Sequence, residues 1–179
     1  MNEAKINIYL SQETDLQDII IHHLCKLVNE AYEKGEFDMW KENIQRIDFQ
    51  SMFKIIQNKS LFIAQIMNQI VGCIKINCIN DKIAEFGMLA TDEKYQNKGI
   101  GKNLIKTAET WAKSNNHTIM QLEILTPRNW VHPNKEFLKI WYTKMGYIYQ
   151  STLDVKKSYP ELALDLKTEC DFLIYQKLL

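Results

Sequence analysis

Two glycines separated by one residue constrain this chain more than any other feature of its sequence. Gly99 and Gly101 occur in QNKGIGKNLI, residues 96–105, and the 179-residue chain has only six glycines. A strand-like run precedes the pair and a run of helical period follows it. A helix begins with four backbone amides that lack an intrahelical acceptor, and with a partial positive charge. Because glycine permits a sharp turn and close approach to the backbone, the pair predicts a phosphate-binding loop.

The composition indicates a globular protein and excludes some partners. The chain is 46% hydrophobic and 25% charged, and its length predicts a single domain over residues 1–179. Lysine plus arginine equal aspartate plus glutamate, at 22 each, so nothing indicates binding to nucleic acid. Arg46 and Arg128 are the only arginines, which excludes an arginine-rich phosphate clamp.

The cysteines and histidines predict no metal site. Cys73 and Cys78 are an odd number of residues apart, so in a strand they point to opposite faces. His22, His23 and Cys25 are close in sequence, but adjacent helical residues point about 100° apart. We therefore expect a solvated helix face there, and reduced structural thiols rather than zinc ligands.

The sequence predicts a cytoplasmic protein that is not associated with a membrane. Residues 1–15 lack a basic stretch followed by an apolar run, so they do not resemble a signal peptide. No apolar segment approaches the length that spans a bilayer.

Hydrophobic periodicity predicts strands and helices that interleave in the middle of the chain. Strands are expected at residues 5–11, 60–67, 70–79, 82–91, 118–125, 147–155 and 170–179. Helices are expected at residues 15–34, 100–113 and 135–145, with a short helix or a loop at 35–49. The second and third strands are expected to form a hairpin with Asn68 and Gln69 in the turn. Glu109 and Lys113 are expected to form an ion pair one helical turn apart. This order indicates a mixed sheet with helices packed on it.

The glycine loop departs from two familiar phosphate-binding patterns. The dinucleotide fingerprint needs a third glycine at position 104, where Leu104 stands. The nucleotide P-loop needs glycine at 96 and Ser or Thr at 103, where Gln96 and Asn103 stand. Instead, residues 96–101 read Gln-Asn-Lys-Gly-Ile-Gly. This resembles the Gln/Arg-x-x-Gly-x-Gly/Ala pyrophosphate loop of the GNAT-type N-acetyltransferases, which bind acetyl-coenzyme A.

Other segments resemble the same family. AEFGMLATDEKYQNKGIG is similar to its fourth strand and loop, and Gly87 stands inside that strand, where glycine favours a bulge. LKIWYTKMGYIY resembles a late helix and strand, with Tyr142 and Gly146 on the family's tyrosine and glycine. The resemblance covers residues 60–149. It departs at Lys135, with Asn134 beside it, where the family often has an asparagine that contacts the cofactor.

The resemblance implies a fold and a co-substrate. The fold is α/β (α+β), with a mixed, mostly antiparallel, twisted sheet of six to seven strands and helices on both faces. The co-substrate is acetyl-CoA, with no metal. The residues that the resemblance assigns to cofactor binding are Met88, Leu89, Ala90, Gln96, Asn97, Lys98, Gly99, Ile100, Gly101, Lys102 and Asn134.

Transfer of an acetyl group to an amine requires a base, an oxyanion donor and an acid for the leaving thiolate. The resemblance makes Glu85 the candidate base, because it lies eleven residues before Gln96, a spacing similar to that of the glutamate base in histone-acetylating members of the family. The alternative is that Glu85 forms an ion pair with a lysine at the surface of the sheet. Strand alternation places Glu85, Gly87 and Leu89 on one face. Glu123 is the reserve base, or it accepts the incoming cation. The resemblance makes Tyr142 the candidate acid, and a backbone amide near Leu89 or Ala90 the oxyanion donor.

The sequence leaves the acceptor open among small amines, amino acids, peptide N-termini and protein lysines. Residues 33–43 with Trp130, His132 and Trp141 would form an acidic and aromatic wall for a cationic amine, or they are solvated and packed residues. A non-catalytic acyl-CoA-binding or protein-interaction domain is the alternative function, and a nucleotide-binding protein is disfavoured. A homodimer is compatible with the sequence.

Overall fold

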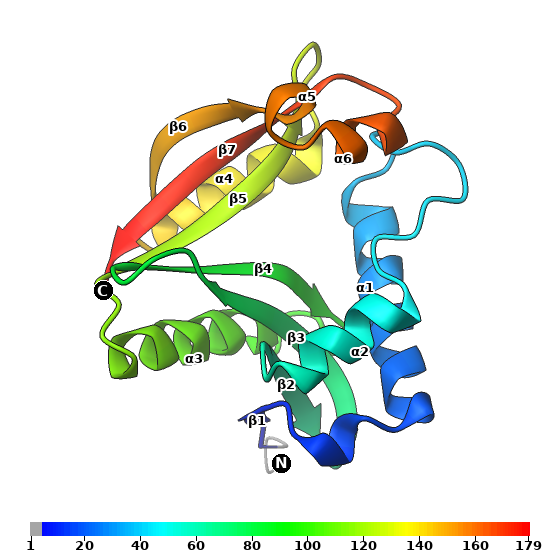
Figure 1. Cartoon of the computed structure of the whole chain (residues 1–179), viewed down its shortest axis with the longest axis vertical. Coiled ribbons are helices and arrows are strands. Elements are labelled where there is room, and N and C mark those ends of the chain that lie inside the picture. The colour runs from blue at the N-terminus through cyan, green and yellow to red at the C-terminus, as the bar shows by residue number, and fades with distance from the viewer. Residues whose placement is uncertain (1–4) are drawn as a thin grey trace.

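The computed structural model describes residues 5–179, in which seven strands form one sheet of order β1-β2-β3-β4-β5-β7-β6. The strands are β1 (Asn7–Leu10), β2 (Leu61–Ile66), β3 (Gln69–Cys78), β4 (Ile83–Thr91), β5 (Ile119–Pro127), β6 (Ile148–Asp154) and β7 (Cys170–Leu178). All neighbouring strands are antiparallel except β4 and β5, which run parallel. The predicted mixed, mostly antiparallel sheet is confirmed (Figure 1).

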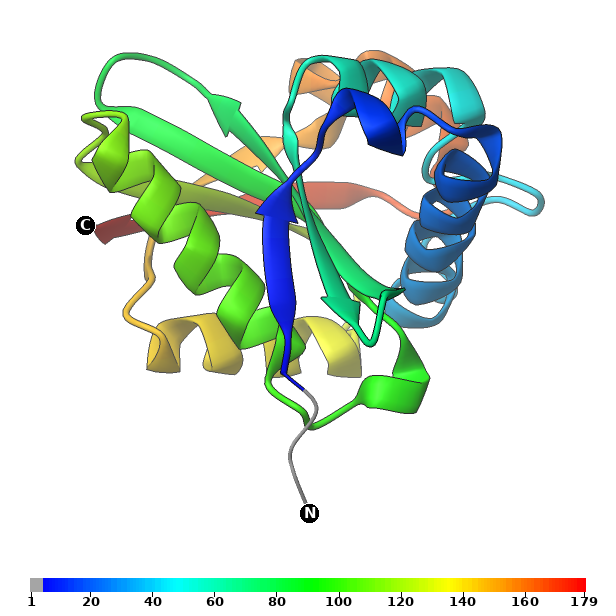
Figure 2. The same ribbon diagram turned by 90° about the horizontal axis from the view of Figure 1, so that it is seen from below.

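Helices cover both faces of this sheet (Figures 1 and 2). They are α1 (Asp18–Gly35), α2 (Phe49–Gln57), α3 (Ile100–Ser114), α4 (Pro133–Lys144), α5 (Val155–Ser158) and α6 (Pro160–Asp165). Apolar residues of α3 and α4 pack on one face of the sheet, and those of α1 and α2 pack on the other. A third cluster lies beneath α5 and α6. The expected α/β class follows from these three layers.

Several local expectations needed correction. In the apolar run of α1, Ile19 is 77% exposed although helical periodicity favours its burial, and Ile21 is buried. Residues 36–48 form a loop, and α2, α5 and α6 were not predicted. The β2–β3 turn has positive φ at Met67 and Asn68, one residue earlier than expected. Glu109 pairs with Lys177 of β7 at 2.9 Å rather than with Lys113.

Strand β4 contains a bulge. Gly87 pairs with Lys75 and Ala90 pairs with Cys73, so three steps along β4 oppose two steps along β3. Met88 takes up the extra residue with a φ of 50°. A non-glycine residue rarely has positive φ, and a strained residue of this kind in a central strand marks a special site.

The bulge changes which residues of β4 share a face. Glu85 and Gly87 lie on the face toward α1, as alternation predicted. Leu89 does not share that face, because the extra residue turns it into the cluster that contains Phe86 and α3. Ala90 packs in the cluster of α1 and α2. The prediction that Glu85, Gly87 and Leu89 share one face is therefore wrong, since strict alternation fails at a bulge.

The two parallel strands separate along their length. β4 and β5 pair only at residues 83–85 with 119–121. Beyond these three pairs β5 turns away from β4 and follows β7 (Figure 1). The sheet therefore has two halves, β1–β4 and β5–β7, which diverge on the C-terminal side of Glu85.

Candidate active site

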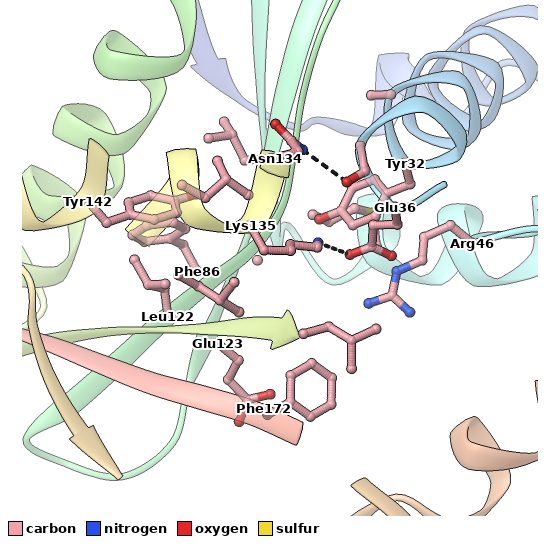
Figure 3. Close-up of a pocket in the computed structure, with 18 of the residues that line it drawn as sticks. Tyr32, Glu36, Arg46, Phe86, Leu122, Glu123, Asn134, Lys135, Tyr142 and Phe172 are labelled. Carbon is pink, nitrogen blue, oxygen red and sulfur yellow. Dashed lines mark hydrogen bonds and ion pairs between the residues drawn. The ribbon is translucent and has the colours of Figure 1, made fainter. Parts of the chain in front are cut away.

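A cleft lies at the point where β4 and β5 separate. Its walls come from these strands, from Phe172 of β7, and from α1 and α4, which lie on opposite faces of the sheet (Figure 3). The lining residues with polar or charged side chains are Tyr32, Glu36, Arg46, Glu85, Glu123, Asn134, Lys135 and Tyr142. The structure thus brings to one cleft six of the residues that the sequence analysis proposed for catalysis or cofactor binding. These six are Glu85, Met88, Leu89, Glu123, Asn134 and Tyr142.

The glycine loop lies at the start of α3. Gly99 is the residue before the helix, with a φ of 73°, and no side chain caps the helix. Within residues 5–179, the backbone amides of residues 97–102 have no protein acceptor, and no acidic residue stands in the first turn. Asn97 also has positive φ, at 62°. Free amides at an uncapped helix start form a site suited to an anion such as a phosphate.

The loop adjoins the cleft but does not line it. A Cβ atom added to Gly101 would lie 3.6 Å from Trp141 and 3.9 Å from Leu89, and Leu89 lines the cleft. The exposed residues of the loop are Gln96, Asn97, Lys98, Gly99 and Lys102. Ile100 is buried in the core, and Ala90, also buried, does not line the cleft. A ligand on the loop amides would therefore reach the cleft past Leu89.

Two carboxyl groups lie on the same face of the cleft. Gln121 Nε2 donates to Glu85 Oε2 at 3.1 Å, and Gln176 Nε2 donates to Gln121 Oε1 at 2.7 Å. Glu123 lies two residues beyond Gln121 on β5, and the Tyr159 hydroxyl donates to it at 3.4 Å. Burial raises the pKa of Glu85, although the hydrogen bond from Gln121 opposes this. Burial and the charge of Glu85 raise the pKa of Glu123 to about 7.

Tyr142 reaches the cleft from α4. Its ring packs against Phe86 and Tyr147, with centroids 6.0 Å apart in each pair. Within the described residues its hydroxyl has no hydrogen-bond partner. Burial raises the pKa of Tyr142 well above its usual value, so the hydroxyl keeps its proton at neutral pH. The side chain is therefore a proton-bearing donor that lines the same cleft as the two carboxyl groups.

The end of α1 meets the start of α4 at the cleft. Lys135 Nζ lies 2.6 Å from Glu36 Oε1, and both side chains are almost fully buried (Figure 3). Glu36 also accepts a hydrogen bond from Trp40 Nε1 at 2.6 Å. Asn134 Nδ2 donates to the carbonyl of Gly35 at 2.9 Å, which leaves its side-chain oxygen for a ligand. Sequence reasoning missed this ion pair because its partners are 99 residues apart. The one sequence signal was Lys135 itself, which stands where the family often has an asparagine.

Of the acidic and aromatic wall considered from the sequence, only an acidic part lines the cleft. Trp130, His132 and Trp141 do not line it, which agrees with the alternative that they are packed residues. Trp130 packs beneath α5 and α6, and His132 is fully buried with Nε2 3.2 Å from the carbonyl of Phe37. Trp141 packs beside Gly101. From residues 33–43, Gly35 and Glu36 do line the cleft, and Glu36 is neutralised by Lys135.

Among residues 5–179, no three His, Cys, Asp or Glu side chains gather where they could hold a metal ion. No described helix is long and apolar enough to cross a bilayer.

An open mixed sheet that separates beside an uncapped, glycine-led helix defines an acetyltransferase type of fold. The family model for the acetyltransferase (GNAT) domain matches residues 57–149, which is just over half of the chain. The chain therefore belongs to the GNAT acetyltransferase family, as the glycine loop and the Tyr142 segment predicted.

Individual relatives agree with this family. An uncharacterized N-acetyltransferase of Chlorobaculum tepidum is 34% identical over 82 residues, which cover 46% of this chain and 48% of the relative. The match thus spans about half the length of that relative. Among solved structures, a ribosomal-protein-alanine N-acetyltransferase from Brucella melitensis superposes with a TM-score of 0.67 at 17% identity, covering 97% of this chain and 99% of that chain. A GNAT family acetyltransferase from Elizabethkingia anophelis, with acetyl-CoA bound, gives 0.61 at 19% identity, covering 99% and 100%.

Proposed function

We propose that this protein transfers the acetyl group of acetyl-CoA to a primary amine by direct attack. One observation carries the proposal: among the described residues, unpartnered amides at the start of α3 adjoin a cleft that contains two half-buried carboxyl groups and a tyrosine hydroxyl without a hydrogen-bond partner. The first feature suits a diphosphate, and the second suits amine chemistry at a thioester. The bound acetyl-CoA in the Elizabethkingia anophelis structure of the same fold supports this co-substrate.

In this proposal the coenzyme lies across the bulge of β4. Its diphosphate accepts hydrogen bonds from the amides of residues 97–102. Its pantetheine arm passes Leu89 into the cleft, with Met88 and the Asn134 side-chain oxygen beside it. The strained backbone at Met88 turns main-chain groups of residues 88–90 toward the thioester, where an amide there would bind the oxyanion.

Glu123 is the proposed base. A primary ammonium has a pKa of about 10.4, so an acid with the ordinary value of about 4.3 removes its proton poorly. The raised pKa of Glu123, about 7, makes it the stronger base. Glu85 remains the sequence-predicted alternative, and its charge helps to raise the pKa of Glu123. Water within the cleft would carry the proton if the amine does not reach the carboxylate.

The reaction balances as follows. The ammonium first loses one proton to Glu123, which passes it to water. The nitrogen of the free amine then forms a bond to the carbonyl carbon, the carbonyl π bond breaks, and the negative charge moves to the carbonyl oxygen. The intermediate collapses with cleavage of the carbon–sulfur bond, and Tyr142 donates a hydrogen bond to the departing thiolate, whose conjugate thiol has a pKa of about 8.5. The nitrogen loses its second proton through Glu123 to the thiolate, so the products are an amide, free coenzyme A and one proton.

Release of free thiol from acetyl-CoA in the presence of a panel of amines tests this function. The expected result is amine-dependent thiol release together with an acetylated amine of the correct mass. Acetyl-CoA at 100 times its Kd should also stabilise the fold by about 2.7 kcal/mol, whereas ATP and NAD should not. Stabilisation by acetyl-CoA without thiol release for any amine would instead support the non-catalytic acyl-CoA-binding alternative.

A further inference from the structure

The two arginines of the chain have opposite surroundings. Arg128 forms ion pairs with Asp154, Glu169 and Asp171, at distances from 2.5 to 3.9 Å. Arg46 lines the cleft, is half-buried, and forms no ion pair within residues 5–179. A guanidinium is always charged and offers a planar fork of donors that matches a carboxylate. An unpaired guanidinium at the wall of a cleft is therefore suited to bind a carboxylate of a ligand.

The fold holds Arg46 in place without neutralising it. Its guanidinium carbon lies 5.2 Å from the ring centroid of Tyr32 and 5.1 Å from that of Trp40. The next residue, Ile47, is buried, and both its amide and its carbonyl bond to the side chain of Asn29 on α1, at 3.0 Å each. Stacking on aromatic rings and a fixed backbone pre-organise the guanidinium and leave its N–H groups free.

The neighbouring charges do not cancel that of Arg46. Glu36 lies on the same side of the cleft as Arg46 in Figure 3, but it is paired with Lys135 and also accepts a hydrogen bond from Trp40. This end of the cleft therefore carries two positive charges and one negative charge. Glu123 lies away from Arg46 in Figure 3, and Glu85 is near enough to Glu123 for its charge to raise the pKa of that residue. A molecule in the cleft can therefore meet these carboxylates with one group and the guanidinium of Arg46 with another.

We propose that the acceptor is a small amino acid-like molecule that carries a carboxylate as well as the primary amine, with Arg46 binding the carboxylate. This proposal rests on the proposed acetyltransferase function. The amine faces Glu123 and Glu85, and the carboxylate forms a two-pronged ion pair with the guanidinium. Opposite charges at the two ends orient the acceptor in one direction, which presents its nitrogen to the thioester.

Matched acceptor pairs test the proposal. Free amino acids and ω-amino acids of increasing chain length are each compared with the amine that lacks the carboxylate, by thiol release with the full chain and acetyl-CoA. We expect at least one carboxylate-bearing amine to have a kcat/KM about 10- to 100-fold above that of its partner, the range of a charge-assisted hydrogen-bonded pair. Arg46→Gln should remove this preference, mainly by raising KM for the carboxylate-bearing acceptor.

Control variants separate binding from folding and from the function itself. Arg46→Lys keeps the charge without the fork and should retain part of the preference, while Arg128→Gln should retain all of it. Thermal unfolding and acetyl-CoA binding of Arg46→Gln should match wild type. If decarboxylated amines are turned over as fast as their carboxylated partners, the Arg46 proposal is wrong and the transferase function stands. If no amine of either kind releases thiol while acetyl-CoA binds, the proposed function itself fails.

Discussion

At the scale of single residues, the chemistry of the cleft depends on two glutamates with unequal surroundings. Gln121 donates a hydrogen bond to Glu85 and stabilises its charge, whereas Glu123 has only a long contact of 3.4 Å from Tyr159. Burial raises the pKa of Glu123, and the neighbouring charge of Glu85 adds to this effect. The two carboxyl groups form an asymmetric pair, in which the member without a close hydrogen-bond donor is suited to act as the base.

This asymmetry predicts a pH profile. Since a base acts in its ionised form, activity should rise with pH through about 7 and then level. Glu123→Gln should lower kcat by about 100-fold and remove that inflection. Glu85→Gln should keep most of the activity and move the inflection to lower pH, because loss of the neighbouring charge makes ionisation of Glu123 easier. Rate measurements from pH 5 to 9 check this. The opposite ranking of the two variants would assign the base to Glu85.

Tyr142 supports a second prediction at this scale. Among residues 5–179 its hydroxyl has no hydrogen-bond partner, so Tyr142→Phe should change the free energy of unfolding by less than about 1 kcal/mol. Turnover should fall about 10- to 100-fold, with acetyl-CoA affinity nearly unchanged, because the hydrogen bond to the thiolate forms only as the sulfur leaves.

Tyr147 is the matched control, because its hydroxyl donates to Glu109 at 2.8 Å and the residue does not line the cleft. Tyr147→Phe should cost stability and leave kcat unchanged. Lost affinity with unchanged turnover in Tyr142→Phe would contradict the role proposed for it.

At the scale of elements, the start of α3 lacks the features that usually stabilise a helix N-terminus. Helices gain stability from a side-chain cap and from acidic residues in the first turn, and α3 has neither. Gly99 stands before the helix with positive φ, and a Cβ atom there would meet no atom within 4 Å. The space around these amides is therefore open, as a site for an external anion requires.

A charge placed at Gly99 tests this use of the helix start. Asn and Asp both tolerate positive φ, so Gly99→Asn and Gly99→Asp should each cost about 1 kcal/mol of stability. Only the aspartate adds a negative charge at the amides, and it should weaken acetyl-CoA binding about tenfold more than the asparagine does. Isothermal titration at two salt concentrations measures the difference, which should shrink at high salt. Equal affinities for the two variants would place the diphosphate elsewhere.

At the scale of the whole molecule, the Lys135–Glu36 pair joins the two halves of the sheet. Glu36 follows α1, which packs on β4, and Lys135 lies in α4, which packs on β5. The halves share only three residue pairs between β4 and β5, so the contact between α1 and α4 is a second tie across the cleft. The cost of desolvating two charges is offset only while both partners are present.

Removal of one partner of the Lys135–Glu36 pair should therefore strongly lower the free energy of unfolding. Lys135→Met should lower the free energy of unfolding by about 3–5 kcal/mol, because it leaves Glu36 buried and unpaired. The double variant Lys135→Met/Glu36→Gln should recover more than half of that loss, since glutamine can still accept the hydrogen bond from Trp40. Urea unfolding at pH 7 measures both values. A loss below about 1 kcal/mol in the single variant would show that the pair does not tie the halves together.

The sequence by itself determined the sheet, its order of elements and the glycine-led start of α3, because periodicity and glycine conformation act between near neighbours in the chain. The resemblance of its motifs to the family pointed to Glu85 and Tyr142, with Glu123 in reserve, and the fold brings all three to the cleft. Only the tertiary structure decided that the bulge at Met88 turns Leu89 to the other face, that Lys135 is neutralised by Glu36, and that Arg46 faces the cleft unpaired. These features join segments distant in sequence, and the charge and burial of such groups depend on which chain segments fold against them.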